Sequence, residues 1–225
     1  MKRWLIAGSL ALVSTTALAD QSTGFYLGAS GGNAKYDISK SDLDAISRSA
    51  FLDNGAIPLN PSSSFDDSDT AFALIAGYRF SPYISVEAGY MDLGSAKYRS
   101  TGNVLIPFFG TFASRINIDV SAKGPFVAGQ LGAPLGGNFD VHTNLGGFFS
   151  KTEFDIGVGL SSFNESDTVS SNSADLFAGV GVGYHFTDSL AASLDYTRFK
   201  DVGDENETGE GDITSFRLGL SYTFR

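Results

Sequence analysis

The sequence predicts an all-β fold, an eight-stranded antiparallel up-and-down barrel that crosses a membrane. Three observations point to it. From Gly24 onward, apolar residues alternate with small or polar ones at a period of two. The connections between these segments alternate between short and long, and the chain ends on one more alternating strand, "FRLGLSYTFR". The alternative is a soluble β-domain, whose apolar faces would point inward.

Residues 1–19 have the features of a signal peptide. Lys2 and Arg3 precede an apolar stretch, and Ala17-Leu18-Ala19 forms a small-residue cleavage site. We expect cleavage between Ala19 and Asp20, which leaves a barrel domain over residues 20–225. An uncleaved anchor helix is the alternative, but the apolar stretch is shorter than the ~20 residues that span a bilayer.

The composition excludes several classes of protein. Of the 15 Lys and Arg residues, two lie in the expected signal peptide, so 13 bases face 25 acids and the mature net charge is −12. An acidic chain is unsuited to nucleic acid, which is bound through a basic surface. The absence of Cys excludes disulfides and thiolate metal sites.

Eight alternating segments each supply the ~9–11 residues that a tilted transmembrane strand needs. They are residues 24–36, 70–80, 83–98, 118–133, 139–154, 173–186, 189–199 and 213–224. In the sixth segment Leu176, Val180 and Val182 share one face, while Gly179 and Gly181 share the other. A membrane barrel turns its apolar face to lipid, and a glycine-rich face suits a polar-packed interior better than a dry core.

The connections predict which side of the membrane each end faces. The turns at 81–82, 134–138 and 187–188 are short, whereas 37–69, 99–117, 155–172 and 200–212 are long. Short periplasmic turns and long extracellular loops are typical of outer-membrane barrels. Aromatic residues gather beside the short turns, as in an interfacial girdle. The last strand is expected to pair with the first, because closure removes the exposed edge.

The terminal strand also resembles the C-terminal assembly signal of outer-membrane barrels, through Arg217, Gly219, Tyr222 and Phe224. Arg225 departs from this pattern, since such proteins commonly end on the aromatic residue. The resemblance implies recognition by the outer-membrane assembly machinery.

The family itself is recognisable in three stretches. "SPYISVEAGYMDLG", "FDVHTNLGGFF" and "FAGVGVGYHFTDSLAASLDY" resemble the transmembrane domain of the OmpA family. The resemblance implies an integral protein of the Gram-negative outer membrane, surrounded by lipid and lipopolysaccharide, with no cofactor. That family often carries a peptidoglycan-binding domain after the barrel, and we expect a stand-alone barrel here.

The family's barrels hold interior charged pairs that are proposed to gate a narrow passage. Acids at matching positions are Glu87 and Asp195, but the basic positions are occupied by Ser30, Gln130, Asn144 and Ser193, so the gate does not carry over.

Strand parity suggests a different interior polar layer, formed by Glu87, Gln130, Asn144, Asp195 and Arg217. We expect Arg217 to lie beside Asp195 and balance its charge, since buried charges are tolerated when paired. The layer is read first as a stabilising plug and second as a conducting path.

The loops hold the remaining candidates. The apolar residues of the second loop, Val104, Ile106, Phe108, Phe109 and Phe112, form a candidate contact surface. In the first loop, Asp42 is expected to cap a short helix with Leu43, Ile46, Ala50 and Phe51 on one face. The two loops are expected to form a lid, to contact a partner or to enter lipid. The fourth loop, Asp201–Asp212, is acidic, and we read it as solvated.

Cations near the same rim are candidates for lipopolysaccharide phosphates. They are Arg99, Lys151, Arg198 and Lys200.

Only His142 and His185 offer imidazole chemistry, and the spacing suggests no serine–histidine pair. The sequence therefore predicts a non-enzyme with a structural or surface-interaction role through its loops. A narrow pore for ions or small solutes is the alternative, and a lipid-modifying enzyme comes third.

Overall fold

The computed structural model describes residues 23–161, 163–204 and 208–224. The expected cleavage site at Ala19 and Asp20 lies outside these residues. The elements are β1 (Gly24–Tyr36), α1 (Lys40–Asp53), β2 (Ile57–Asp66), β3 (Ser68–Ser81), β4 (Ile84–Ile106), β5 (Gly110–Gly136), β6 (Phe139–Leu160), β7 (Phe163–His185), β8 (Leu190–Asp204) and β9 (Gly209–Thr223). No helix in the described part of the chain is long and apolar enough to cross a membrane.

Eight of the strands form a closed antiparallel ring, so the predicted barrel is confirmed. Each strand pairs with its neighbours in the order β1, β3, β4, β5, β6, β7, β8, β9, and β9 returns to β1. The seam runs from Tyr26 opposite Thr223 to Tyr36 opposite Ile213. The terminal strand therefore has no free edge within the barrel.

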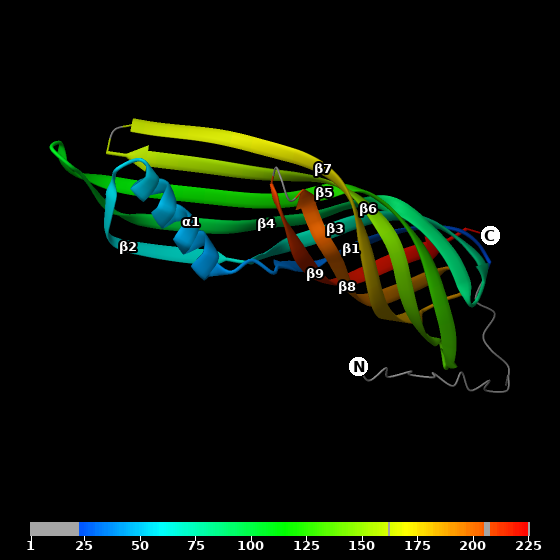
Figure 1. Cartoon of the computed structure of the whole chain (residues 1–225). Coiled ribbons are helices and arrows are strands. Elements are labelled where there is room, and N and C mark those ends of the chain that lie inside the picture. The colour runs from blue at the N-terminus through cyan, green and yellow to red at the C-terminus, as the bar shows by residue number, and fades with distance from the viewer. Residues whose placement is uncertain (1–22, 162, 205–207, 225) are drawn as a thin grey trace, which may run out of the picture.

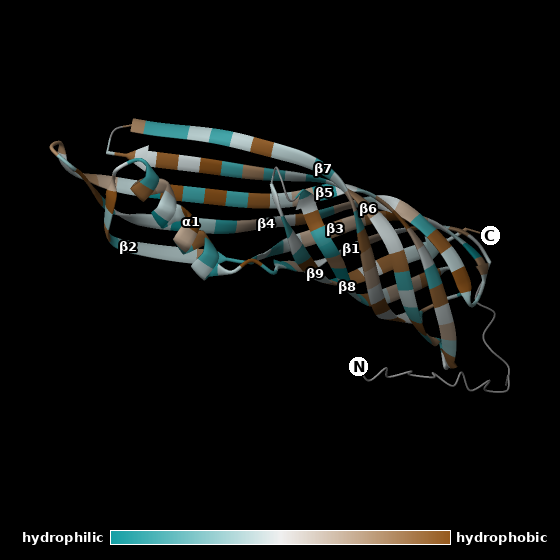
Figure 2. Ribbon diagram, in the orientation of Figure 1, coloured by the Kyte–Doolittle hydropathy of each residue, from teal (hydrophilic) through white to brown (hydrophobic). Residues whose placement is uncertain are grey.

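Hydrophobic and hydrophilic residues alternate along the strands of the barrel (Figure 2), and the large apolar side chains lie exposed on its outer surface. Leu74, Leu176 and Leu218 are 61%, 68% and 62% exposed, which is the pattern of a surface that meets lipid. Exposed aromatic rings pack together beside the short turns, including Tyr78 on Phe80 and Tyr222 on Phe224.

Strands β4 to β7 continue far beyond the barrel, where the sequence predicted loops (Figure 1). Residues 99–117, 155–161 and 163–172 are strand except for turns at 107–109 and at 161. The loop assignment is wrong because alternation continues past the bilayer, and cross-strand pairing does not require lipid. We call these outer parts together with β2 the projecting sheet.

A bulge marks the boundary between barrel and projecting sheet. The register of β4 shifts between Asp92 and Ser95, and Gly94 has a φ of 67°, which favours glycine. Below the bulge β4 pairs with β3, and above it β4 pairs with β2. The extra strand β2 thus takes the place of β3 in the projecting sheet.

Helix α1 packs on the face of the projecting sheet that continues the lining of the barrel. Leu43 lies in one apolar cluster with Tyr98, Ile116 and Ile118. Figure 1 shows the helix alongside the projecting sheet rather than across the barrel mouth, so the first and second loops pack together but do not form the lid expected there.

The predicted cap and face of the helix are wrong. Ser39 is the N-cap residue, and Asp42 lies inside the first turn. Leu43 and Ser47 are buried, whereas Ile46 is 59% exposed.

The outer half of the barrel is filled by aromatic rings. The ring centroid of Phe199 lies 5.3 Å from that of Phe148 and 5.3 Å from that of Phe177, and Phe126 lies 6.1 Å from Phe177. The expectation of a small or polar lumen is wrong in this layer. The inward glycines leave space for rings from neighbouring strands instead of lining a wet channel.

Candidate functional site

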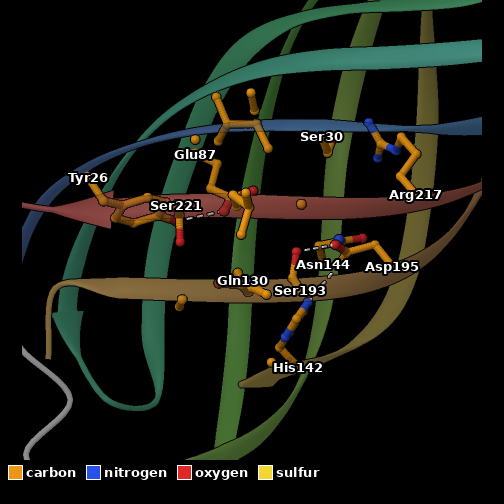
Figure 3. Close-up of a pocket in the computed structure, with 18 of the residues that line it drawn as sticks. Tyr26, Ser30, Glu87, Gln130, His142, Asn144, Ser193, Asp195, Arg217 and Ser221 are labelled. Carbon is orange, nitrogen blue, oxygen red and sulfur yellow. Dashed lines mark hydrogen bonds and ion pairs between the residues drawn. The ribbon is translucent and has the colours of Figure 1, made fainter. Parts of the chain in front are cut away.

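The predicted polar residues of the barrel interior do come together. Glu87, Gln130, Asn144, Asp195 and Arg217 line one cavity of about 90 Å³ beneath the phenylalanine layer. Figure 3 shows their side chains pointing into the barrel from different strands. A cavity of this size holds a few water molecules and no larger ligand.

Glu87 on β4 and Gln130 on β5 each accept a hydrogen bond from a side chain on another strand. The hydroxyl of Tyr26 donates a hydrogen bond of 2.6 Å to Glu87 Oε1. Ser85 donates one of 2.7 Å to Gln130 Oε1. Gln130 stands opposite Asn144 in the β5–β6 register, as its predicted place in the layer requires.

The strongest feature is a chain of imidazoles and carboxylates that the sequence analysis missed. His142 Nε2 lies 2.7 Å from Asp195 Oδ1, and its Nδ1 lies 3.2 Å from Asp140 Oδ1. His185 Nε2 lies 2.8 Å from Asp140 Oδ2, while Ser193 donates a bond of 2.7 Å to Asp195 Oδ2. Asp140 and His142 share a face because they are two residues apart on β6. That spacing was the available signal.

Glycines on β7 make room for this chain. A Cβ atom at Gly181 would lie 2.3 Å from His142 Nε2 and 2.5 Å from Asp195 Oδ1. A Cβ atom at Gly183 would lie 2.3 Å from Asp140 Oδ2. The glycine-rich strand and the imidazole–carboxylate chain are therefore parts of one packed layer.

The predicted direct pairing of Arg217 with Asp195 is wrong. The two residues stand opposite each other in the β8–β9 register. The guanidinium nevertheless lies 3.1 Å from Met91 Sδ and 3.4 Å from Thr197 Oγ1, and its Nε has no hydrogen-bond partner among the described residues. His142 takes the expected place beside Asp195, because Asp195 points toward β6.

The layer has no nucleophile arranged for covalent chemistry. Ser193 donates to Asp195 and not to His142, so the described residues hold no serine–histidine pair here. Within the described ranges no group of three or more His, Cys, Asp or Glu side chains is placed to hold a metal ion.

The predicted loop contact residues separate into two groups. Phe108 and Phe109 form the turn between β4 and β5, and they are fully exposed and 78% exposed. Ile106 and Phe112 are partly buried, and Val104 is fully buried in the projecting sheet. Of the five predicted contact residues, Phe108 and Phe109 are the two exposed ones, and the alternation of the strands buries Val104.

The rim cations proposed to meet lipopolysaccharide have carboxylate partners within the chain. Arg99 makes two bonds of 2.8 and 3.0 Å to Asp119. Lys151 lies 2.7 Å from Glu153, and Arg198 lies 2.6 Å from Asp212. Asp212 belongs to β9, and Asp201 to β8, so the prediction of a loop over Asp201–Asp212 is wrong at both ends. Lys200 lies 3.4 Å from Asp201.

The C-terminal signal residues lie on the seam. Arg217, Gly219 and Tyr222 belong to β9, and Phe224 follows it. The Phe224 amide donates to the Phe25 carbonyl at 2.8 Å, and their rings stack 5.8 Å apart.

Comparison with known proteins gives a family. A family model of the OmpA-like transmembrane domain matches residues 20–225. Outer membrane protein A of Shigella flexneri is 30% identical over 178 residues, which cover 78% of this chain and 46% of that protein. Outer membrane protein A of Serratia marcescens is 30% identical over 66% of this chain and 37% of its own length. The chain thus spans less than half the length of these relatives.

Solved structures with a similar course of the chain are outer-membrane proteins. Neisserial surface protein A is 16% identical with a TM-score of 0.43, covering 90% of this chain and 98% of its own. The outer membrane protease OmpT from Escherichia coli is 12% identical with a TM-score of 0.45, covering 94% of this chain and 100% of its own. Similarity at this level carries no argument about activity.

Proposed function

The chain belongs to the OmpA-like transmembrane domain family, and from this premise we propose that it is a closed anchor for a contact surface outside the cell. It is an integral β-barrel of the outer membrane. The proposal assigns two roles. The packed barrel holds the chain in the lipid, and the projecting sheet carries an apolar tip away from it.

The exposed turn at Phe108 and Phe109 is the observation that carries the proposal. Phe108 adopts a φ of 70°, a left-handed conformation that is unusual for a bulky residue. Its ring is fully exposed at this turn. Phe163, at the neighbouring β6–β7 turn, is 63% exposed. Exposed apolar groups at the end of a projection mark an interaction site, and aromatic residues are common anchors in such sites.

The experiment compares the adherence of whole cells that display the chain to a cultured epithelial monolayer. We expect the double variant Phe108→Ser/Phe109→Ser to lower adherence at least about threefold at equal surface level. Ile46→Ser is the control, since it removes an exposed apolar side chain from α1 and not from the tip. Wild-type cells that adhere no better than cells without the chain, or a tip variant that adheres equally, would contradict the proposal.

We propose the interior layer as a stabilising plug rather than a gate. The phenylalanine layer above it supports this reading, because an eight-stranded barrel is just wide enough for side chains to fill. Within the described residues no observation favours the pore. We also propose that the chain is not an enzyme, since Ser193 donates its hydrogen bond to Asp195 and the partners of His142 among the described residues are carboxylates.

The domain boundary and the assembly signal also remain proposals. We propose that residues 1–19 are removed, that residues 20–225 form the barrel domain, and that the assembly machinery recognises the end of β9. The mass of the protein purified from outer membranes tests the first point, because a mature chain beginning at Asp20 has one defined mass. Outer-membrane lipid is the expected surrounding of the barrel.

A further inference from the structure

A second cavity lies outside the barrel, between α1 and the projecting sheet. Its volume is about 180 Å³, and Ser47, Arg48 and Phe51 of α1 line it together with Pro58 of β2, Asn103 of β4 and Ser114 of β5. The tip residues do not line this cavity.

The wall of this cavity contains a buried hydroxyl group, that of Ser47, without a hydrogen-bond partner among the described residues. Ser47 is 7% exposed, and its Oγ has no partner among the described residues. A buried hydroxyl without a partner is costly, and such groups in native proteins usually have a water or a ligand beside them. The helix thus buries a polar residue where its apolar pattern would favour an aliphatic one.

The negative charge at the cavity is already satisfied. Asp44 accepts hydrogen bonds from Ser63 at 2.6 Å, Tyr98 at 2.7 Å and Lys40 at 2.9 Å. The bond from Ser63, followed by that from Tyr98, lowers the pKa of Asp44 to about 2, so the carboxylate stays ionised at neutral pH. Asp44 is therefore held in place and has little capacity left for a ligand.

The positive charge is not satisfied. Arg48 is exposed at the rim and makes no hydrogen bond or ion pair with any described residue. A guanidinium matches the geometry of a carboxylate and binds it with two parallel hydrogen bonds. The remaining polar lining is neutral, and Phe51 and Pro58 add apolar surface.

We propose that this cavity binds a sugar acid, a single hydroxylated ring that carries one carboxylate. The carboxylate pairs with Arg48, the hydroxyls take the hydrogen bonds offered by Ser47, Asn103 and Ser114, and the C–H surface of the ring covers Phe51 and Pro58. The same chemistry occurs in a free sugar acid and in the terminal unit of an acidic polysaccharide. This site is separate from the tip, so the two proposals stand independently.

The test uses the refolded chain, residues 20–225, in detergent micelles with sodium glucuronate as the probe. Saturation-transfer NMR should give a dissociation constant on the order of 1 mM, as expected for a ligand of this size. Glucose, which lacks the carboxylate, should bind at least about tenfold more weakly. Arg48→Gln should weaken glucuronate binding by a similar factor, whereas Lys200→Gln, which removes an exposed cation outside the cavity, should not.

A second variant tests the hydrogen-bonding side of the cavity without changing its charge. Asn103→Ala should weaken glucuronate and glucose alike without removing charge. An oligosaccharide ending in glucuronate that binds better than the free acid identifies a polysaccharide terminus as the source, and equal binding identifies the free acid. No binding by folded protein, binding unchanged in Arg48→Gln, or equal competition by inorganic phosphate overturns the sugar-acid site. The Phe108→Ser/Phe109→Ser variant should bind glucuronate normally, so failure of one proposal leaves the other intact.

Discussion

The ring of Phe177 on β7 occupies the space where a residue other than glycine at position 146 of β6 would place its side chain. A Cβ atom at Gly146 would lie 2.5 Å from Phe177 Cζ and 2.4 Å from the carbonyl oxygen of Val127. The same relation holds between Gly89 and Phe126, with 2.7 Å to Cε1. Inward-facing glycines thus leave the space that the phenylalanine rings fill in the barrel interior.

Gly146→Ala should therefore destabilise the barrel. We expect a loss of about 1–3 kcal/mol in the free energy of unfolding, the usual cost of overpacking. Urea unfolding in lipid vesicles, followed by the mobility of unheated protein on gels, measures it. Gly129→Ala on β5 is the matched control, because its Cβ would meet nothing within 4 Å. Equal stability of the two variants would contradict the interpretation that Gly146 leaves space for the ring of Phe177.

The imidazole of His142 should be the main stabilising group of the interior polar layer. His142→Leu leaves Asp140 and Asp195 without their shared partner, and loss of one partner from a buried pair costs about 3 kcal/mol or more. Adding Asp195→Asn to His142→Leu should recover part of the loss, because it removes the uncompensated charge. The same unfolding assay gives the coupling between the two sites. A double variant less stable than His142→Leu alone would show that Asp195 does not depend on this contact.

The packing of α1 should depend on acid pH through Asp44. Its folded pKa of about 2 lies below the ordinary value of 3.8, so its contribution is fully present above pH 3.8 and is lost as the pH falls through about 2. Pepsin cleavage within α1 should accelerate over that window in the wild-type chain. Asp44→Asn should expose α1 already at pH 4, while Asp42→Asn, in the first turn of the same helix, should retain the wild-type profile. A profile of Asp44→Asn identical to wild type would refute the linkage.

Phe224→Ala should reduce the amount of folded protein in the outer membrane of living cells. The reason is that Phe224 belongs to the proposed assembly signal, at the seam where its exposed ring stacks on Phe25. Leu220→Ala, on the same exposed face of β9, is the control. Refolding of purified Phe224→Ala into lipid should stay close to wild type. An equal deficit in refolding would assign the effect to stability and not to recognition by the assembly machinery.

The barrel could be predicted from the sequence because lipid enforces a strict alternation and a closed edge. The outer halves of β4 to β7 could not be predicted in this way, because the bilayer limits the length of a transmembrane strand but not that of strands paired outside it. The inward-facing residues could be predicted because alternate residues of a strand face the barrel interior, and Glu87 and Arg217 do lie on the inner face. The alternation of a strand does not say which inward neighbour a side chain contacts, so the contact between Asp195 and His142 could not be predicted.

The most direct test of the closed anchor is the single-channel current of the refolded chain, residues 20–225, in a planar bilayer. Folding is established beforehand by the shifted mobility of unheated protein on gels. The packed layer of Phe126, Phe148, Phe177 and Phe199 predicts a silent bilayer. Reproducible current steps that change in Glu87→Ala would contradict the account, because they would require a continuous path past both layers.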